Sequence, residues 1–78
     1  MQYDNFVMKV LSTANTIGKI LLTSGGETYR VEKAISIICK RFDLKAETFV
    51  TMTCVLTSAK KRDGETITEV NRIYTVSN

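Results

Sequence analysis

Residues 24–32, Ser-Gly-Gly-Glu-Thr-Tyr-Arg-Val-Glu, hold the groups most able to do chemistry, a guanidinium between two carboxylates. A helix that begins here presents free N–H groups, and Arg30 beside them could bind the carboxylate of a ligand. In the structural alternative, Arg30 pairs with Glu27 or Glu32, this pair fixes the turn, and Tyr29 packs as a lid on the core. Physical chemistry alone favours the structural alternative.

Two further polar segments each allow a functional and a plain interpretation. A threonine ladder could contact a small polar solute, or it could be the solvent face of a strand; its members are Thr48, Thr51, Thr53 and Thr57. The basic run Lys-Lys-Arg at residues 60–62 could contact acidic headgroups or nucleic acid, or it could be a solvated hairpin tip. We expect the plain interpretation for both. For the basic run, no aromatic residue lies among the basic ones, so nucleic-acid binding gains little support.

The residue types present exclude several kinds of active site. There is no histidine, which excludes a histidine general base and any Ser-His or Cys-His pair. Gly25-Gly26 lacks the spacing of the phosphate-binding glycine motifs. Cys39 and Cys54 cannot complete a zinc site by themselves, and we expect buried free thiols, with a disulfide as the alternative. We therefore expect no catalytic residues, no metal and no cofactor.

The totals describe one folded domain. The 78 residues are 44% hydrophobic and 24% charged and include no proline, so disorder is not expected. The net charge of +3 is mild and gives no indication of a nucleic-acid partner. No apolar run approaches the roughly 20 residues that a membrane span needs.

A first helix is predicted from the apolar residues that recur at helical spacing between residues 7 and 21. Asp4 or Asn5 can cap this helix at its start. Gly18 on the apolar face predicts a close approach to another element. Gly25-Gly26 ends the helix, because glycine accepts the left-handed conformation of a helix C-terminus.

A second helix is predicted from about Thr28, the proposed cap, to about Asp43. Glu27 and Glu32 suit the positive end of its dipole. Its apolar stripe consists of Val31, Ala34, Ile35, Ile38 and Phe42.

Two strands are predicted in the second half. Residues 48–57 alternate, with one apolar side formed by Val50, Met52, Cys54 and Leu56. Asp63-Gly64 marks a turn, and residues 66–76 form the second strand, whose less regular alternation indicates a bulge or burial on both faces. The predicted fold class is α+β, a two-helix hairpin followed by an antiparallel β-hairpin. Because two strands are too few for a stable sheet, we expect missing chain or a second copy to complete it.

These segments resemble the N-terminal domain of the threonine/serine exporter family, once catalogued as a domain of unknown function. Residues 18–25 fit the family pattern Gly-x-x-Leu-Leu-x-x-Gly, and Gly26 is followed by the block Glu-Thr-Tyr-Arg-Val-Glu at residues 27–32. Phe-Val-Thr-x-Thr at residues 49–53 and Arg72-Ile73 extend the resemblance, which covers about residues 11–73.

The chain departs from the family pattern at two positions. Family members usually carry an acidic residue where Lys33 stands and a proline where Met52 stands. Lys33 removes any role that needs a further acidic residue there. Met52 predicts a more regular strand.

The resemblance implies a larger protein of the cell (inner) membrane, in which a soluble cytoplasmic domain precedes several transmembrane helices. Characterised relatives export threonine and serine, driven by the membrane potential or proton gradient, and split relatives with two membrane subunits export succinate. Residues 1–78 would then be a single soluble domain, the N-terminal fragment, with the transport path elsewhere. Its partner would be the transmembrane portion of the same protein or a partner membrane subunit.

We expect a functional surface for a small amino or carboxylic acid at Glu27, Thr28, Arg30 and Glu32, with Thr51 and Thr53 next. Arg30 would meet a substrate carboxylate or lock a gate, and the acidic residues would meet an amino group or carry coupling charge. A competing hypothesis is a self-associating α+β module, in which an exposed strand edge pairs two chains and the charged turn is scaffold. A third is a ligand-sensing domain that gates the exporter.

Overall fold

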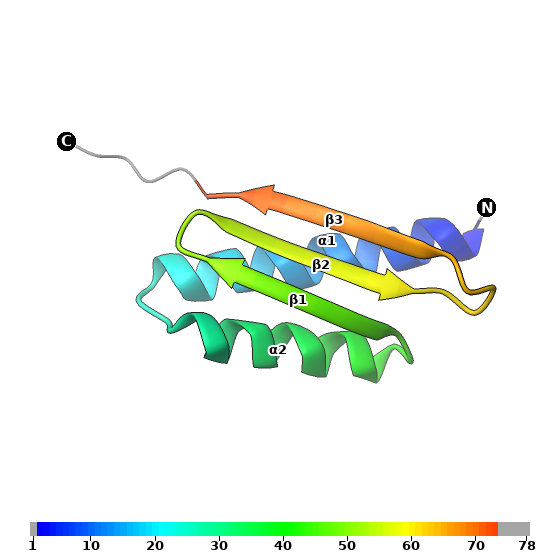
Figure 1. Cartoon of the computed structure of the whole chain (residues 1–78), viewed down its shortest axis with the longest axis horizontal. Helices are drawn as coiled ribbons and strands as arrows, with labels where there is room; N and C mark the ends of the chain where they lie inside the picture. Colours follow the sequence, from blue (N-terminus) through cyan, green and yellow to red (C-terminus); the bar gives the residue numbers. More distant parts are fainter. Residues whose placement is uncertain (1, 74–78) are drawn as a thin grey trace.

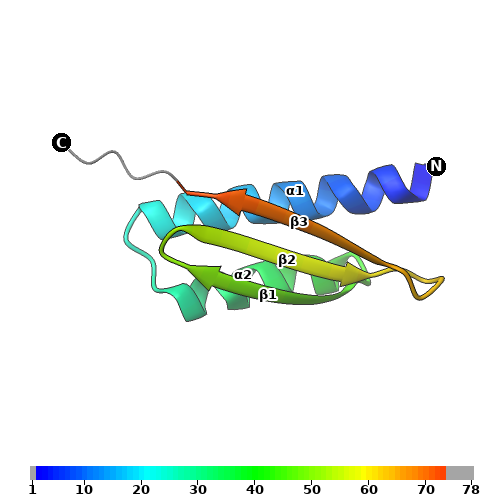
Figure 2. The same ribbon diagram turned by 45° about the horizontal axis from the view of Figure 1, so that its top comes forward.

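A computed structural model describes residues 2–73 of the chain as two helices and three strands. The elements are α1 (Gln2–Thr23), α2 (Thr28–Arg41), β1 (Lys45–Thr51), β2 (Cys54–Lys60) and β3 (Thr66–Arg72). The strands pair antiparallel in the order β1-β2-β3, and both helices lie against one face of the sheet (Figure 1, Figure 2). The predicted α+β class is confirmed, with three strands in place of two and a sheet that does not close.

The connection between α1 and α2 closes as its glycines predict. Gly25 has a φ of 97° and donates its N–H to Leu22 O at 3.1 Å, while Gly26 N donates to Leu21 O at 2.9 Å. These two bonds form a Schellman motif, which satisfies carbonyl groups that the helix end would otherwise leave free. A Cβ atom at Gly26 would lie 2.8 Å from Leu21 O, so the second glycine is required by space.

The helix starts differ from the predicted caps. α1 begins at Gln2, so Asp4 and Asn5 lie inside the helix, where Asp4 places a negative charge in the first turn. α2 is capped by Glu27 and not by Thr28, because the Glu27 carbonyl already accepts the N–H of Arg30 at 3.0 Å. The Glu27 side chain makes no capping hydrogen bond.

Gly18 permits the close contact between α1 and α2 that its position predicted. A Cβ atom there would lie 2.7 Å from Ile35 Cδ1 and 3.1 Å from Val31 Cγ1. Both of these side chains are fully buried, so they have little room to move. A glycine at this point therefore sets the distance between the two helices.

A tight turn at Met52 and Thr53 splits the segment that was predicted as one strand. Thr51 pairs directly with Cys54 across the turn, and Val50 consequently pairs with Val55. Cross-strand partners share a face, so residues of even number on β1 lie on the same face as residues of odd number on β2. The predicted apolar side of residues 50–56 is therefore wrong, and the expected more regular strand at Met52 is a turn.

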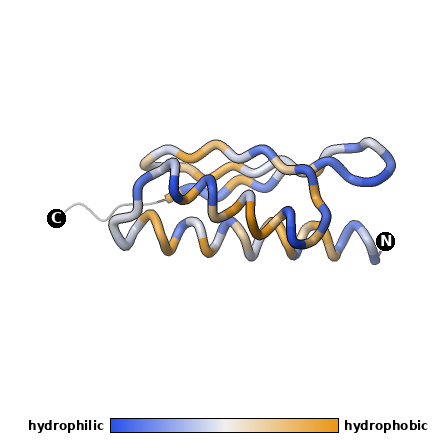
Figure 3. Tube along the Cα trace, turned by 90° about the horizontal axis from the view of Figure 1, so that it is seen from below, coloured by the Kyte–Doolittle hydropathy of each residue, from blue (hydrophilic) through white to orange (hydrophobic). Residues whose placement is uncertain are grey.

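One face of the sheet forms the core with the helices, and the other is open. The core residues are Val7, Val10, Leu11, Ala14, Leu22, Val31, Ile35, Cys39, Leu44, Val50, Val55, Ala59 and Ile73. On the open face, Phe49, Leu56 and Val70 form a cross-strand row, in which Phe49 is 62% exposed. The apolar sides of both helices are therefore buried against one face of the sheet only. Figure 3 shows the two helices on the same side of the strands.

Cys39 and Cys54 are free thiols; Cys39 is fully buried, which raises the pKa of its thiol, whereas Cys54 is only half-buried.

The β2–β3 register runs without a bulge from Cys54↔Arg72 to Lys60↔Thr66, so the irregular alternation of β3 has another cause. That cause is the exposure of Val70 on the open face. Tyr74 and Val76, predicted as part of this strand, lie outside the described residues.

Candidate functional site

The fold brings the charged segment 27–32 and the β1–β2 turn to the same end of the molecule. Figure 1 shows the α1–α2 connection and the turn between β1 and β2 side by side at that end. A direct bond confirms the contact, because Glu32 Oε2 accepts the backbone N–H of Val50 at 3.0 Å. Of the predicted residues on α2, Glu32 is thus the one that the structure joins to the β1–β2 segment.

Arg30 is exposed and forms no ion pair with either neighbouring glutamate among residues 2–73. Its Nε donates to the hydroxyl of Tyr29 at 3.3 Å, and its Cζ lies 5.8 Å from the centre of the Tyr29 ring. Tyr29 itself is 57% exposed and does not pack on the core. The predicted Arg30–Glu pair and the predicted lid are thus wrong, since Glu32 is directed to β1 and Tyr29 faces solvent with Arg30.

Glu32 connects α2 to the edge strand β1. A strand edge exposes unpaired backbone groups, and a carboxylate that accepts one of them makes a charge-assisted hydrogen bond. Glu32 is half-buried, so the bond is partly shielded from water. This geometry gives Glu32 a structural task that the sequence pattern did not indicate.

Replacing Glu32 by alanine is expected to lower the free energy of unfolding by about 1 kcal/mol, because the Val50 N–H loses its partner. Glu32→Gln keeps an acceptor oxygen and should retain most of that stability. Urea unfolding of the two variants and the parent chain measures the difference. Equal losses for alanine and glutamine would show that the charge of Glu32, and not its bond to Val50, matters.

The two threonines at this end form part of the turn. Thr51 Oγ1 accepts the backbone N–H of Thr53 at 3.2 Å, and the two hydroxyl oxygens lie 3.4 Å apart. Hydroxyl groups that bond to the backbone two residues on stabilise turns of this kind. Thr28 lies in the first turn of α2 and is half-buried. Arg30 and Glu27 are exposed on α2, whereas the threonine-rich turn meets α2 only through the bond of Glu32 to the neighbouring Val50.

The threonine ladder does not form one surface. Thr57 is fully buried beneath the helices, and its hydroxyl donates to Asn15 Oδ1 at 2.6 Å. Thr51, at the end of β1, and Thr53 lie at the turn, whereas Thr57 is buried, so the solvent face predicted for Thr57 is wrong. The turn at residues 52–53 moves Thr57 to the helix-covered side.

Asn15 is a buried polar residue of α1 that the sequence analysis did not single out. Its Nδ2 donates to Glu69 O at 3.0 Å and to Asn71 Oδ1 at 3.0 Å, and lies 3.4 Å from Val55 O. The signal was present, since Asn15 lies on the buried side of a helix that is otherwise apolar there. Asn15 joins α1 to both β2 and β3.

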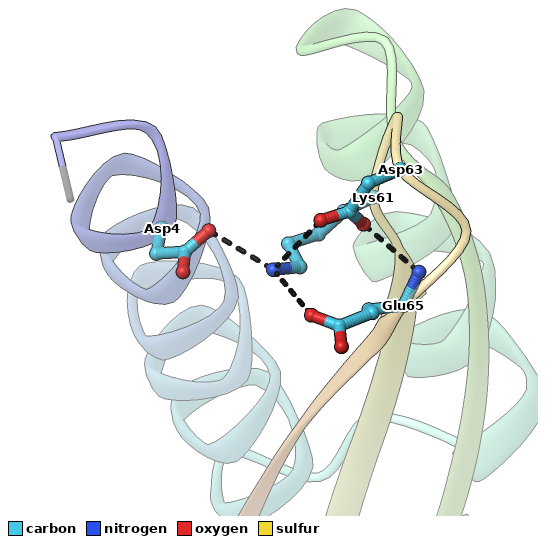
Figure 4. Close-up of polar contacts among 4 residues, drawn as sticks. All are labelled: Asp4, Lys61, Asp63 and Glu65. Atoms are coloured by element: carbon cyan, nitrogen blue, oxygen red, sulfur yellow. Dashed lines mark hydrogen bonds and ion pairs between the residues drawn. The ribbon is translucent and has the colours of Figure 1, made fainter.

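A second polar cluster lies at the opposite end, where the hydrophilic β2–β3 connection meets the start of α1 (Figure 3, Figure 4). Lys61 Nζ lies 3.0 Å from Asp4 Oδ1, 3.4 Å from Glu65 Oε1 and 3.6 Å from Asp63 Oδ2. The Lys61 side chain is only 7% exposed. Residue 61 is therefore not part of a solvated hairpin tip, because its ammonium group holds the hairpin to α1.

The hydrogen bond to Asp4 raises the pKa of Lys61, and burial acts in the opposite direction. Because the pKa of Lys61 is higher in the folded state, its ion pairs stabilise the fold fully below the ordinary lysine pKa of 10.5. This stabilisation is lost as the pH rises through the pKa of the folded state. We therefore expect the melting temperature to fall more steeply above this pH for the parent chain than for Lys61→Met. Parallel slopes for the two chains would contradict this role of the cluster.

Residues 2–73 include no group of three or more histidine, cysteine, aspartate or glutamate side chains placed to hold a metal ion. Within the same residues, no helix combines the length and the apolarity needed to cross a bilayer.

Comparison with known protein families matches residues 12–78 to the family described as "Putative threonine/serine exporter". The matched residues make up most of the chain. They include the contact between α1 and α2, the charged segment 27–32 and the three strands. The chain belongs to this exporter family. Comparison with curated proteins and with solved structures finds no match. The family relates the chain to transport proteins. Within the charged segment, Glu32 is held in a structural contact and Arg30 is exposed.

Proposed function

We propose that the chain is a non-enzymatic, cytoplasmic domain of a secondary exporter of threonine, serine or related small amino or carboxylic acids in the inner membrane. It works with a membrane-spanning portion of the same protein or of a partner membrane subunit. The family match over residues 12–78 supports the transport role. In this proposal the transport path lies in the membrane-spanning portion and not in residues 1–78.

The observation that carries the proposal is the state of Arg30. Its guanidinium is exposed, is oriented by Tyr29 and forms no ion pair with Glu27 or Glu32 among residues 2–73. An exposed guanidinium offers paired N–H donors that match the two oxygens of a carboxylate. Arg30 therefore meets a substrate carboxylate or locks a gate, and Glu27 supplies the nearby negative charge for an amino group.

The functional surface consists of Glu27, Thr28 and Arg30, with Glu32, Thr51 and Thr53 around them. Glu32 bonds α2 to β1, and Thr51 bonds to Thr53 within the turn, so these residues hold the β1–β2 turn beside α2. The proposal thus separates an exposed contact residue, Arg30, from supporting residues that hold its surroundings.

Export by the protein with its membrane-spanning portion tests this role. We expect Arg30→Ala to reduce threonine or serine export about tenfold, as the loss of one charge-assisted pair with a carboxylate would. The melting temperature of the 78-residue chain should stay nearly unchanged, since an exposed side chain is replaced. Lys33→Ala, one turn further along the same exposed side of the helix, is the matched control and should leave export unchanged.

Unchanged export in Arg30→Ala, together with a lower melting temperature of the chain, would assign Arg30 a structural role instead. Amide chemical shifts provide a second measurement on the chain alone. Titration with threonine, serine and succinate should perturb residues near Arg30 if the domain senses the ligand. No perturbation there would exclude the sensing role.

The alternative function is self-association through a strand edge. Glu32 occupies the N–H of Val50 on β1, which directs strand pairing by a second copy to the opposite edge, β3. Light scattering after size exclusion tests this alternative. A dimer at high concentration that dissociates on mutation of the β3 edge would support it, and a strict monomer would count against it.

A further inference from the structure

Three lysines surround a groove at the end of the molecule opposite to Arg30. The groove has a volume of about 680 Å³ and lies between the second half of α2, the start of β1 and the end of β2. Its polar lining includes Lys40, Lys45, Lys60, Ser36, Thr66 and Glu47. The groove therefore carries an excess of positive charge, with hydroxyl groups among the ammonium groups.

The arrangement of two of these lysines is unfavourable for the fold alone. Lys45 and Lys60 are direct cross-strand partners. Like charges in such a pair destabilise a sheet. Neither residue, nor Lys40, lies within 4.0 Å of a carboxylate in the described range 2–73, where the acidic side chains Asp4, Asp63 and Glu65 are drawn to Lys61.

Helix electrostatics account for Lys40 but not for the other two lysines. Lys40 lies in the last turn of α2, where a positive charge interacts favourably with the helix dipole. Lys45 and Lys60 lie on strands, so this interaction does not apply to them. An anion bound between Lys45 and Lys60 would relieve the repulsion between their charges.

We propose that this lysine groove is a binding site for a phosphate-bearing anion. A phosphate group presents several acceptor oxygens to several ammonium groups at once, and the hydroxyl of Thr66, the cross-strand partner of Lys60, can donate to the same oxygens. The groove is open to solvent and leaves room for a ligand larger than an inorganic phosphate ion. That ligand is a phospholipid headgroup or a soluble phosphate compound, and the site is independent of the Arg30 surface.

The experiment uses the 78-residue chain with two probes at constant ionic strength. Pyrophosphate represents a soluble ligand and is followed by amide chemical shifts. Vesicles of phosphatidylglycerol, with phosphatidylcholine vesicles as the neutral control, represent the headgroup and are followed by co-sedimentation. The test variant is Lys45→Gln/Lys60→Gln, and the matched control is Lys9→Gln/Lys33→Gln, which removes the same charge from exposed positions outside this groove.

We expect saturable binding to at least one probe, with shifts confined to residues near Lys40, Lys45 and Lys60. The test variant should bind about 25-fold more weakly, since each lysine near an anionic surface contributes about fivefold. Binding to pyrophosphate identifies a soluble phosphate compound, and binding to phosphatidylglycerol vesicles alone identifies the headgroup.

Lys45→Glu provides a second, independent measurement. It converts the like-charge pair into an opposite-charge pair, so it should raise the melting temperature and abolish anion binding together. The proposal is overturned if neither probe binds, or if the control variant loses as much affinity as the test variant. An unchanged affinity in Lys45→Glu would overturn it as well.

Discussion

Replacing Asn15 by leucine is expected to lower the free energy of unfolding by about 3 kcal/mol, because several buried hydrogen bonds are lost together. A chain of this length has a total stability of only about 4–12 kcal/mol, so the loss is a large part of it. Thr57 is the partner most affected, since its buried hydroxyl donates to Asn15 at 2.6 Å. Chemical unfolding with urea gives the difference directly.

The double variant Asn15→Leu/Thr57→Val distinguishes hydrogen bonding from packing. Removing both partners by apolar groups of similar shape leaves no buried hydroxyl without an acceptor. The double variant should therefore be more stable than Asn15→Leu alone by about 1 kcal/mol. Thr16→Ala, at the exposed neighbouring position, is the control and should change stability by less than about 0.5 kcal/mol. Additive losses from Asn15 and Thr57 would show that the two side chains do not act as a pair.

The second large effect is expected at Gly18, where α1 and α2 come closest. Gly18→Leu should lower the free energy of unfolding by about 3 kcal/mol, because even a Cβ atom would lie 2.7 Å from Ile35 Cδ1. Ile35 is fully buried and cannot turn into solvent. The helices must therefore separate or their side chains must leave favourable rotamers. Thermal and urea unfolding measure this loss.

Ile35→Ala supplies the complementary variant. Alone it should cost about 2–5 kcal/mol, because it leaves a cavity in the core. In Gly18→Leu/Ile35→Ala the new leucine occupies the space that Ile35 leaves, so the combined loss should be smaller than the two single losses together. A sum that is simply additive would mean that Gly18 and Ile35 are not in contact in solution.

Polar contacts at both ends of the molecule join the helices to the one sheet face that they cover. At one end, Glu32 bonds the outer strand β1 to α2. At the other, Lys61 and the stacking of Arg62 on Tyr3, 4.9 Å from its ring centre, hold the β2–β3 connection to α1. Asn15 adds a third connection in the middle. Each helix is thereby joined to the sheet by polar bonds as well as by the core.

The location of the proposed functions follows from this arrangement. Glu32, Lys61 and Asn15 are polar residues engaged in structural contacts, so they are poor candidates for ligand binding. Within residues 2–73, Arg30 bonds to the exposed Tyr29 but forms no ion pair, and Lys45 and Lys60 form no ion pair either. These two groups lie at opposite ends of the domain, which allows the substrate surface and the anion groove to be tested separately.

The sequence by itself determined the two helices, the glycine-closed turn between them, the close contact at Gly18, the α+β class and the family. These features depend on local signals: helical periodicity, the left-handed preference of glycine, and a specific run of residues at 26–32. Each signal acts over a few residues, so it can be recognised without knowing the rest of the chain.

Only the tertiary structure decided the third strand, the buried side of β2 and the partners of Glu32, Lys61 and Asn15. The turn at Met52 and Thr53 contains no glycine, asparagine or proline that would indicate a turn in the sequence. Because the turn has two residues, even-numbered residues face the core on β1 and odd-numbered residues face it on β2. The polar partners are far apart in sequence, as with Lys61 and Asp4 or Asn15 and Thr57. Such pairs form because burial makes an unpaired polar group costly, and which groups are buried together is a property of the whole fold.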